Sequence, residues 1–429
     1  QNLGTATGFG GTGVVSWDTG SIKTTGFTAV TGTGYFCDTT GGGFTVTLPL
    51  SPSAGDVVGV ADYAQTWDTA NLTLGRNSSN IGGVATDSTI STEGLAVTLV
   101  YVDGTKGWIV TDSGLQSEAP GPLFVTATGG TPCSGAIVCT DYKTHTFTGP
   151  GTFCVSASGN AAGSNSIDYL VVAGGGGGGG YTGGGGAGGY RESPGTASGS
   201  YTVSPRGAAP AVALPVAVAG YPVTVGGGGA GSVANNCKGT NGNNSVFTGT
   251  TTITSTGGGA GAGDTAPTRD GNPGGSGGAN AYIPANPVLG CIGLGNTPPT
   301  NPPQGMNSGN TNSDSATYTT GGGGGGALVV GGNGSAPTAA AGGGGATSSI
   351  NGTPTARAGG GGGGSDAAKT VGCGGAGGGG KGASPACTTP APQRNAADNT
   401  GGGGGGGVPS GSGVGSGGSG VVIIRYKFQ

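Results

Sequence analysis

Apolar and polar residues alternate along several short stretches of the first 115 residues. Phe44, Val46 and Leu48 are separated by threonines, and the same period of two recurs at 72–74 and 95–101. Apolar residues also open strands at 57–60 and 108–110, and an Asp-Gly pair at 103–104 predicts a hairpin between the last two strands. Residues 35–115 therefore predict a small all-β domain with a thin core. Residues 1–34 precede it as a lead-in segment, poor in apolar positions at its start, that we expect to need a partner for order.

The rest of the chain predicts a second β-domain. Residues 116–123 carry two prolines and are typical of a linker. Extended segments flank a Gly-Pro-Gly turn at 149–151, and apolar strands follow at 167–172, 221–225 and 421–428. Two of these strands lead directly into glycine runs, and the last one ends the glycine region, which a flexible linker would not do. We therefore expect residues 124–429 to form a β-sandwich whose first and last strands pair, with the glycine segments folded back between them.

Glycine dominates this second region. The chain contains 110 glycines, many of them in uninterrupted runs at 174–180, 183–186, 226–229, 257–259, 321–326, 342–345, 359–364, 377–380 and 401–407. No three-residue repeat with proline is present, which excludes collagen. A glycine run can form the left-handed polyglycine II helix, with three residues per turn and no internal hydrogen bonds. Such helices satisfy their backbone groups by packing side by side, because no Cβ separates them.

We therefore predict a polyglycine II helix bundle in which the runs are the core and the spacers are loops at its ends. The alternative is a set of mobile glycine loops attached to the sandwich. The low charge argues against ordinary disorder, since charged residues make up only 7% of the chain against roughly 25% in globular proteins. The net charge of −4 and the lack of a basic stripe predict no nucleic-acid partner.

No stretch approaches the 18 apolar residues of a membrane span. The sequence begins at Gln1, without methionine, so we expect a processed product or a fragment. Eight cysteines permit disulfides. Cys133 and Cys139, and Cys373 and Cys387, are close enough in sequence to pair, but free thiols are equally compatible with the pattern.

The sequence offers little catalytic chemistry. Its one histidine, His145, has no second ligand at metal-binding spacing and no suitable serine or cysteine partner, so we expect a structural role. Carboxylates are too sparse to nominate a glycosidase pair, and we see no repetitive β-helix pattern of the kind that carries capsule-degrading enzymes. We predict no enzyme, no catalytic residue, no cofactor and no metal.

Several motifs resemble known modules. The segments HTFTGPGTF at 145–153, DYLVVAGGG at 168–176, GGAGGYR at 185–191, VTVGG at 223–227 and GGSGVVIIRY at 417–426 resemble a glycine-rich domain common in bacteriophage tail-fibre and adhesin proteins. A similar plan occurs in the extracellular glycine-rich domain of the anaplastic lymphoma kinase receptor group. This resemblance covers residues 123–429 and implies a jelly-roll-like sandwich with polyglycine helices. The segments GYFCDTT at 34–40, NLTLGRN at 71–77 and YVDGTKGW at 101–108 resemble a small β-domain of phage tail fibres.

Binding residues are sought in the spacers, because exposed aromatic rings can stack on sugars and arginines can hydrogen-bond anionic glycans. If the spacers are loops, the candidates for receptor binding are Tyr181, Tyr190, Arg191, Tyr201, Arg269, Tyr282 and Tyr318. For each tyrosine the alternative is a structural one, in which the ring caps a glycine helix or packs on another chain. Two glycine-poor spacers, 280–320 and 383–400, are the candidates for variable recognition loops.

The resemblance implies a homotrimeric phage tail fibre or distal adhesin on the virion tail. Such a subunit binds a host surface polysaccharide or outer-membrane protein and joins other virion tail proteins at its N-terminal end. The alternative is a purely structural virion or extracellular filament protein without receptor binding. Native mass and cell binding separate these two hypotheses.

Overall fold

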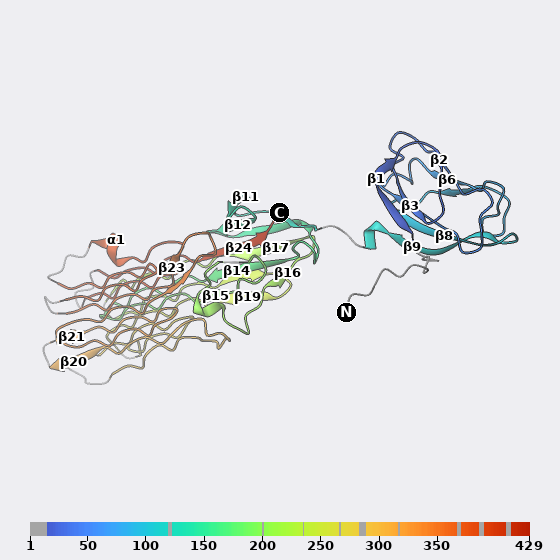
Figure 1. Cartoon of the computed structure of the whole chain (residues 1–429). Helices are drawn as coiled ribbons and strands as arrows, with labels where there is room; N and C mark the ends of the chain where they lie inside the picture. Colours follow the sequence, from blue (N-terminus) through green and yellow to red (C-terminus); the bar gives the residue numbers. More distant parts are fainter. Residues whose placement is uncertain are drawn as a thin grey trace. The chain divides into compact units, whose positions relative to one another are not determined.

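The chain folds into two compact units, Gln1–Gly121 (unit 1) and Pro122–Gln429 (unit 2). The computed structural model describes residues 15–118, 122–199, 201–234, 236–265, 267–282, 289–315, 318–366, 370–385, 390–408 and 413–429. The division falls inside the predicted linker. Both units are built from strands, with one four-residue α-helix, α1, in the described part of the chain, so the all-β prediction is confirmed (Figure 1).

Unit 1 consists of two sheets, one of five strands in the order β1-β3-β5-β8-β9 and one of four in the order β2-β4-β6-β7. Its elements are β1 (Ser16–Lys23), β2 (Phe27–Thr28), β3 (Thr33–Cys37), β4 (Thr45–Thr47), β5 (Val57–Asp62), β6 (Leu72–Gly75), β7 (Ser88–Ile90), β8 (Leu95–Asp103), β9 (Gly107–Leu115) and a 3-10 helix, Gln116–Glu118. The predicted strands and the hairpin between β8 and β9 are confirmed.

The winding of unit 1 corrects two expectations. The first six strands alternate between the two sheets, and among these six the neighbours within each sheet pair in parallel, as in a short β-solenoid, whereas β7, β8 and β9 add antiparallel. We saw no β-helix pattern because parallel pairing joins residues far apart in sequence and leaves no local signal. In addition, β1 and β2 lie within the stretch 1–34 that we expected to be a lead-in segment. The folded unit therefore begins before residue 35.

Unit 1 has a core of its own. Alternate residues of both sheets meet in one apolar cluster, in which the indoles of Trp67 and Trp108 are fully buried. These two large rings add apolar area to the core that the alternating strand pattern alone does not reveal. The core is therefore larger than the thin core that the strand pattern predicts.

Unit 2 begins with an antiparallel β-sandwich. One sheet has the strand order β10-β13-β17-β18-β19 and the other β11-β12-β24-β14-β15, with β16 pairing to β14. Their bounds are β10 (Val125–Thr128), β11 (Thr131–Val138), β12 (Tyr142–Phe147), β13 (Gly151–Ser158), β14 (Ser166–Val172), β15 (Tyr190–Glu192), β16 (Leu214–Pro215), β17 (Ala219–Thr224), β18 (Ser245–Thr248), β19 (Thr252–Ser255) and β24 (Val421–Lys427). The last strand, β24, lies between β12 and β14, so the strands that lead into and out of the glycine region pair as expected, whereas the first strand of the sandwich, β10, lies in the other sheet.

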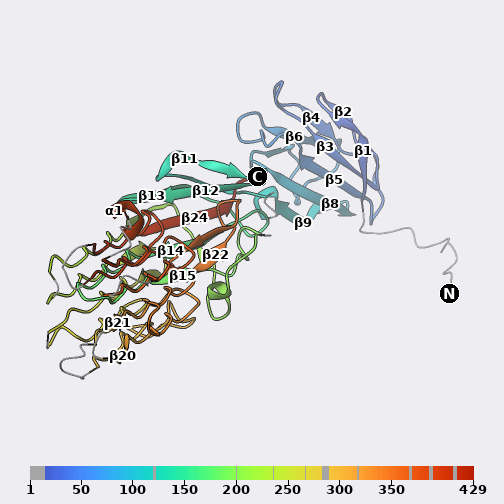
Figure 2. The same ribbon diagram turned by 90° about the vertical axis from the view of Figure 1, so that its left-hand side faces the viewer.

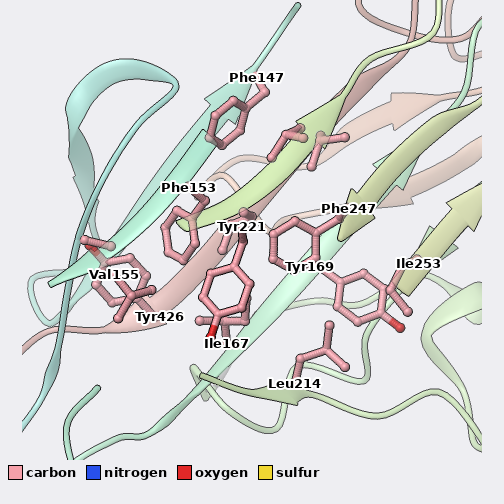
Figure 3. Close-up of a cluster of buried hydrophobic side chains, with 14 of the residues drawn as sticks. Phe147, Phe153, Val155, Ile167, Tyr169, Leu214, Tyr221, Phe247, Ile253 and Tyr426 are labelled. Carbon is pink, nitrogen blue, oxygen red and sulfur yellow. The ribbon is translucent and has the colours of Figure 1, made fainter. Parts of the chain in front are cut away.

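Aromatic side chains fill the space between the two sheets (Figure 3). Phe153 is fully buried and lies near Tyr221, Phe247 and Tyr426, with ring centroids 6.0–6.5 Å apart. Rings at such distances pack favourably in tilted or edge-to-face arrangements. This cluster joins strands that are more than 250 residues apart in sequence and fixes the sandwich from which the glycine segments start.

The remaining short elements of unit 2 lie in the spacers. They are a 3-10 helix (Pro205–Gly207), β20 (Asn312–Ser315), β21 (Tyr318–Thr320), β22 (Ala346–Ser348), β23 (Thr355–Arg357) and α1 (Ala391–Arg394). β20, β21 and α1 lie at the end of the glycine segments that is remote from the sandwich. This end is on the left in Figure 1 and faces the viewer in Figure 2. The hairpin β22–β23 lies at the opposite end, where Ile350 packs with Leu170 and Ile423 on the outer face of the β24-β14 sheet.

The glycine runs form an ordered bundle with a period of three. A Cβ on Gly174 or Gly177 would meet residues 226–231, one on Gly175 or Gly178 would meet residues 401–406, and one on Gly176 or Gly179 would meet residues 258–262. Every third residue thus faces the same neighbour, which is the period of the polyglycine II helix. Most of these contacts would bring Cβ within about 2 Å of a backbone oxygen, so the packing requires glycine.

Backbone hydrogen bonds hold the runs together. The amides of run 174–180 donate to segments 237–243, 415–418 and 183–186, all of which run antiparallel to it. Its carbonyls accept from segments 229–232, 258–261 and 404–407, all of which run parallel to it. The backbone groups that the helix cannot pair internally are therefore satisfied between segments. This network supports the bundle and not the alternative of mobile glycine loops.

Candidate functional site

The turns remote from the sandwich gather at one end of the bundle, which we call the loop end. The first turn, at Tyr181 and Thr182, reverses the chain between runs 174–180 and 183–186. Thr182 has a φ of 64°, which non-glycine residues rarely adopt, and its carbonyl accepts from the amide of Gly364 at 2.7 Å. The neighbouring segments thus hold this turn in a single conformation.

Tyr181 is the centre of one polar group at the loop end. Burial raises the pKa of its hydroxyl; the nearby side chain of Thr319 opposes this shift, and the carboxylates of Asp366 and Asp264 add to it. Asp366 accepts from the amide of Thr319 at 2.7 Å, so the turn at 365–366 is tied to β21. A half-buried phenol beside two carboxylates can donate a hydrogen bond to a polar ligand or accept one from it.

A second polar group lies on turns 236–241 and 264–272. Lys238 Nζ donates to Asn272 Oδ1 at 2.7 Å, and Asn272 in turn donates to Asn241 at 2.8 Å. Burial lowers the pKa of Lys238, and the charge of Asp270 opposes this shift. Arg269 Nε donates to the carbonyl of Asp264 at 3.1 Å, which connects this group to the surroundings of Tyr181. The loop end therefore presents linked polar side chains from several turns.

Four of the seven predicted residues lie at the loop end. Tyr181 and Arg269 are half-buried in the groups described above. Tyr282 is also half-buried, and the residue before it donates its amide to the carbonyl of Arg269 at 2.9 Å. Tyr318 belongs to β21, and its side chain is outside the described residues.

The other three lie at the sandwich end. Tyr190 in β15 is 1% exposed and donates its hydroxyl to Glu192 at 3.1 Å, so the expectation that it is exposed is wrong. Arg191 is half-buried and donates to the carbonyl of Thr254 at 3.4 Å. Tyr201 lies over the guanidinium of Arg425 at 5.0 Å, and burial raises the pKa of its hydroxyl. The chain turns at both ends of the bundle, so a spacer between two glycine runs can lie at the sandwich end as well as at the loop end.

Sequence reasoning missed a buried polar cluster beneath these residues. Glu192 is 1% exposed and accepts from the hydroxyls of Tyr190, Ser204 and Ser348. Burial raises the pKa of its carboxyl, and these hydrogen bonds oppose the shift. Ser348 belongs to the hairpin β22–β23, so the cluster fastens that hairpin to the sandwich. A glutamate between a buried strand and a serine-rich spacer was its only sequence signal.

The glycine-poor spacer 280–320 is not a single loop. Asn280 and Gln304 are fully buried, and their side-chain oxygens accept from the amides of Thr311 and Thr256, each at 2.8 Å. These side-chain amides pair backbone groups inside the bundle, as the glycine backbone does elsewhere. Parts of this spacer therefore cross the bundle, and the hairpin β20–β21 is its portion at the loop end.

His145 is fully buried in the sandwich, with Nδ1 2.6 Å from the carbonyl of Gly129 and Nε2 3.0 Å from the hydroxyl of Tyr426. Burial lowers the pKa of the imidazole, as expected for a structural residue. Among the described residues no group of histidine, cysteine and carboxylate side chains could hold a metal, and no helix could span a bilayer. Cys133 and Cys139 are both free thiols, as is Cys373, while Cys387 lies outside the described residues.

The family of the chain follows from its second unit. The glycine-rich domain family matches residues 146–427, about two-thirds of the chain, and the protein belongs to this family. The match begins near the end of β12 and ends in β24, so it covers the whole bundle and the sandwich without β10, β11 and most of β12. No curated protein matches the chain.

Proposed function

We propose that this protein is a phage tail-fibre or distal adhesin subunit that attaches to a bacterial surface polysaccharide or outer-membrane protein through its loop end. The observation that carries the proposal is the bundle itself. The hydrogen-bonded glycine backbone holds turns of varied sequence side by side. Tyr181 and Arg269 lie on these turns among linked polar groups. A rigid display of this kind lowers the entropy cost of binding, and several copies on a virion would add avidity.

The resemblance of both units to tail-fibre modules supports the same proposal. In this proposal the subunit is part of the virion tail and joins other tail proteins at its N-terminal end. The proposed assembly is a homotrimer, which the resemblance to tail-fibre proteins implies.

Exchange of the loop-end side chains tests receptor binding. In Tyr181→Ala/Arg269→Ala we expect adsorption of the fluorescently labelled chain to bacterial cells to fall at least tenfold, because an aromatic and a cationic contact are lost together. The measurement is labelled-chain binding to a panel of bacterial strains and to their purified surface polysaccharides. The matched control is Arg191→Ala at the sandwich end, which should bind as the wild type does. Wild-type chain that binds no strain, or a double variant that binds equally well, would contradict the proposal.

The native mass tests the assembly. Light scattering on the purified chain is expected to give three times the 39.6 kDa chain mass. Open-ended polymers would favour a structural filament instead, and a monomer would remove the trimer from the proposal while leaving a detachable adhesin.

A further inference from the structure

The outer face of the five-stranded sheet in unit 1 has an unusual composition. Alternate residues of its strands face the core, and the residues between them face outward in register across the sheet. One outward row contains Trp17, Gly34, Gly59, Thr98 and Asp112, and the next contains Phe36, Ala61, Ala96 and Gly114. Each row starts with an aromatic ring on the β1 side and continues over small residues towards β9.

This pattern hollows the face. A cavity of about 440 Å³ opens over the small residues, within the range of roughly 300–1,000 Å³ typical of small-molecule sites. Trp17 lies directly on the sheet, because a Cβ on Gly34 would come within 2.7 Å of its indole carbons, and a Cβ on Gly59 within 3.3 Å. The ring is 37% exposed, so its other side faces the hollow and solvent.

The two sides of the hollow differ in chemistry. Trp17 and Phe36 form an aromatic pair on one side, with centroids 5.1 Å apart. The carboxylates of Asp62, Asp112 and Glu118 line the remainder, and none of the described lining residues is basic. Asp62 is fixed by the backbone amides of residues 66, 67 and 94, whereas Asp112 and Glu118 are exposed.

The aromatic side extends beyond the first hollow. A second hollow of about 360 Å³ shares Phe36 and is lined also by Thr19, Ile22 and Tyr63. The Tyr63 side chain is 56% exposed. Trp17, Phe36 and Tyr63 therefore line two adjoining hollows and give a surface longer than one small-molecule site.

We propose that this face of unit 1 binds a neutral oligosaccharide. The apolar C–H face of a pyranose ring stacks on exposed aromatic rings, and its hydroxyls donate to carboxylates. A hollow with aromatic rings on one side and carboxylate acceptors on the other complements both the apolar face and the hydroxyls of a pyranose. The carboxylates would repel uronic acids, sialic acids and phosphorylated glycans, so the ligand is a neutral hexose or N-acetylhexosamine polymer. This site is separate from the loop end and does not depend on its function.

Tryptophan fluorescence of the full chain tests the site. Of the three tryptophans, Trp67 and Trp108 are fully buried, so a change of emission on binding reports Trp17. The probes are dextran, mannan, β-galactan and chitohexaose, with oligolysine and heparin as charged comparisons. We expect at least one neutral glycan to shift the emission to shorter wavelength with saturation. Calorimetry on the same glycan should show at least a tenfold loss of affinity in Trp17→Ala, because the stacking surface is lost.

Matched variants distinguish this site from general damage and from the loop end. Asp112→Asn should weaken glycan binding severalfold, whereas Asp68→Asn, an exposed acid of unit 1 outside the hollow, should not change it. The emission change itself separates this site from the loop end, because all three tryptophans lie in unit 1. An unaltered thermal transition of the Trp67 and Trp108 emission would show that Trp17→Ala is folded. The proposal is overturned if no neutral glycan shifts the emission, if only oligolysine does, or if Trp17→Ala binds the glycan as the wild type does.

Discussion

Replacing Gly178 by alanine is expected to destabilise unit 2 by at least about 3 kcal/mol. An ideal Cβ at this position would lie 2.1 Å from the carbonyl oxygen of Gly405 and 2.7 Å from its carbon. Both atoms belong to the backbone of a neighbouring run, so no side chain can move aside. Relief requires the two runs to separate, which weakens the hydrogen bonds that join them, from the amides of Gly404 and Gly407 to the carbonyls of Gly176 and Gly179.

The bundle supplies its own control for this prediction. Gly227 is exposed, and a Cβ there would approach nothing nearer than 3.9 Å, at the side chain of Asn243. Gly227→Ala should therefore change the stability by less than about 1 kcal/mol, and alanine's smaller loss of backbone entropy could even improve it. The same substitution should thus have very different effects on stability at two glycines that the sequence cannot tell apart.

Denaturant unfolding read separately for the two units checks this result. All three tryptophans lie in unit 1, so their fluorescence follows unit 1 alone. Hydrogen exchange of peptides from residues 170–260 follows unit 2. The unit 2 transition should move to lower denaturant in Gly178→Ala, with the tryptophan transition unchanged. Equal unit 2 transitions in Gly178→Ala and the wild type would show that the runs are not closely packed in solution.

The strands and the bundle could be predicted from the sequence because their signals are local. A period of two identifies β8, an apolar run identifies β14, and uninterrupted glycine permits one extended helix that must find partners outside itself. The direction of those partners could not be predicted, since a glycine run carries no side chains that select parallel or antiparallel neighbours. The contacts of Gly174 to Gly180 show that it uses both.

The candidate site was harder to predict for a different reason. A tyrosine in a spacer can lie at the loop end, as Tyr181 does, or beneath the sandwich, as Tyr190 and Tyr201 do. The position of each tyrosine depends on the residue that it contacts. Tyr190 contacts Glu192, and Tyr201 contacts Arg425, which is remote in sequence. Composition cannot reveal contacts across more than 200 residues. In 280–320, asparagine and glutamine likewise act as bundle residues and not as loop residues.

The second large effect is expected at Arg425, where alanine should destabilise unit 2 by about 3–5 kcal/mol. Arg425 is fully buried in β24, with its guanidinium 4.8 Å from the ring of Tyr142 and 5.0 Å from that of Tyr201. Its Nη1 donates to the carbonyl of Ile350 in the turn of the hairpin β22–β23, at 3.2 Å. One side chain thus joins the sandwich to the segment that covers its outer face.

The charge of Arg425 matters as well as its volume. Asp168 is its register partner on β14 and is also fully buried. That carboxylate accepts from the hydroxyls of Ser193 and Ser198, at 2.7 and 2.6 Å. The described side chains of Arg425 and Asp168 form no direct ion pair, but removing the cation leaves the buried carboxyl of Asp168 with neutral hydrogen-bond donors and without a positive charge on the neighbouring strand.

A series of substitutions separates these contributions in unit 2 unfolding. Arg425→Met keeps most of the volume but removes the charge, and should remain at least about 2 kcal/mol below the wild type. Arg425→Lys keeps the charge but loses the planar stacking between the two rings, and should recover part of the loss. Arg191→Ala in neighbouring β15 removes a half-buried arginine with a single 3.4 Å hydrogen bond and should cost less than about 1 kcal/mol. If Arg425→Met is as stable as the wild type, Arg425 acts by packing alone and the buried charge of Asp168 needs no cation beside it.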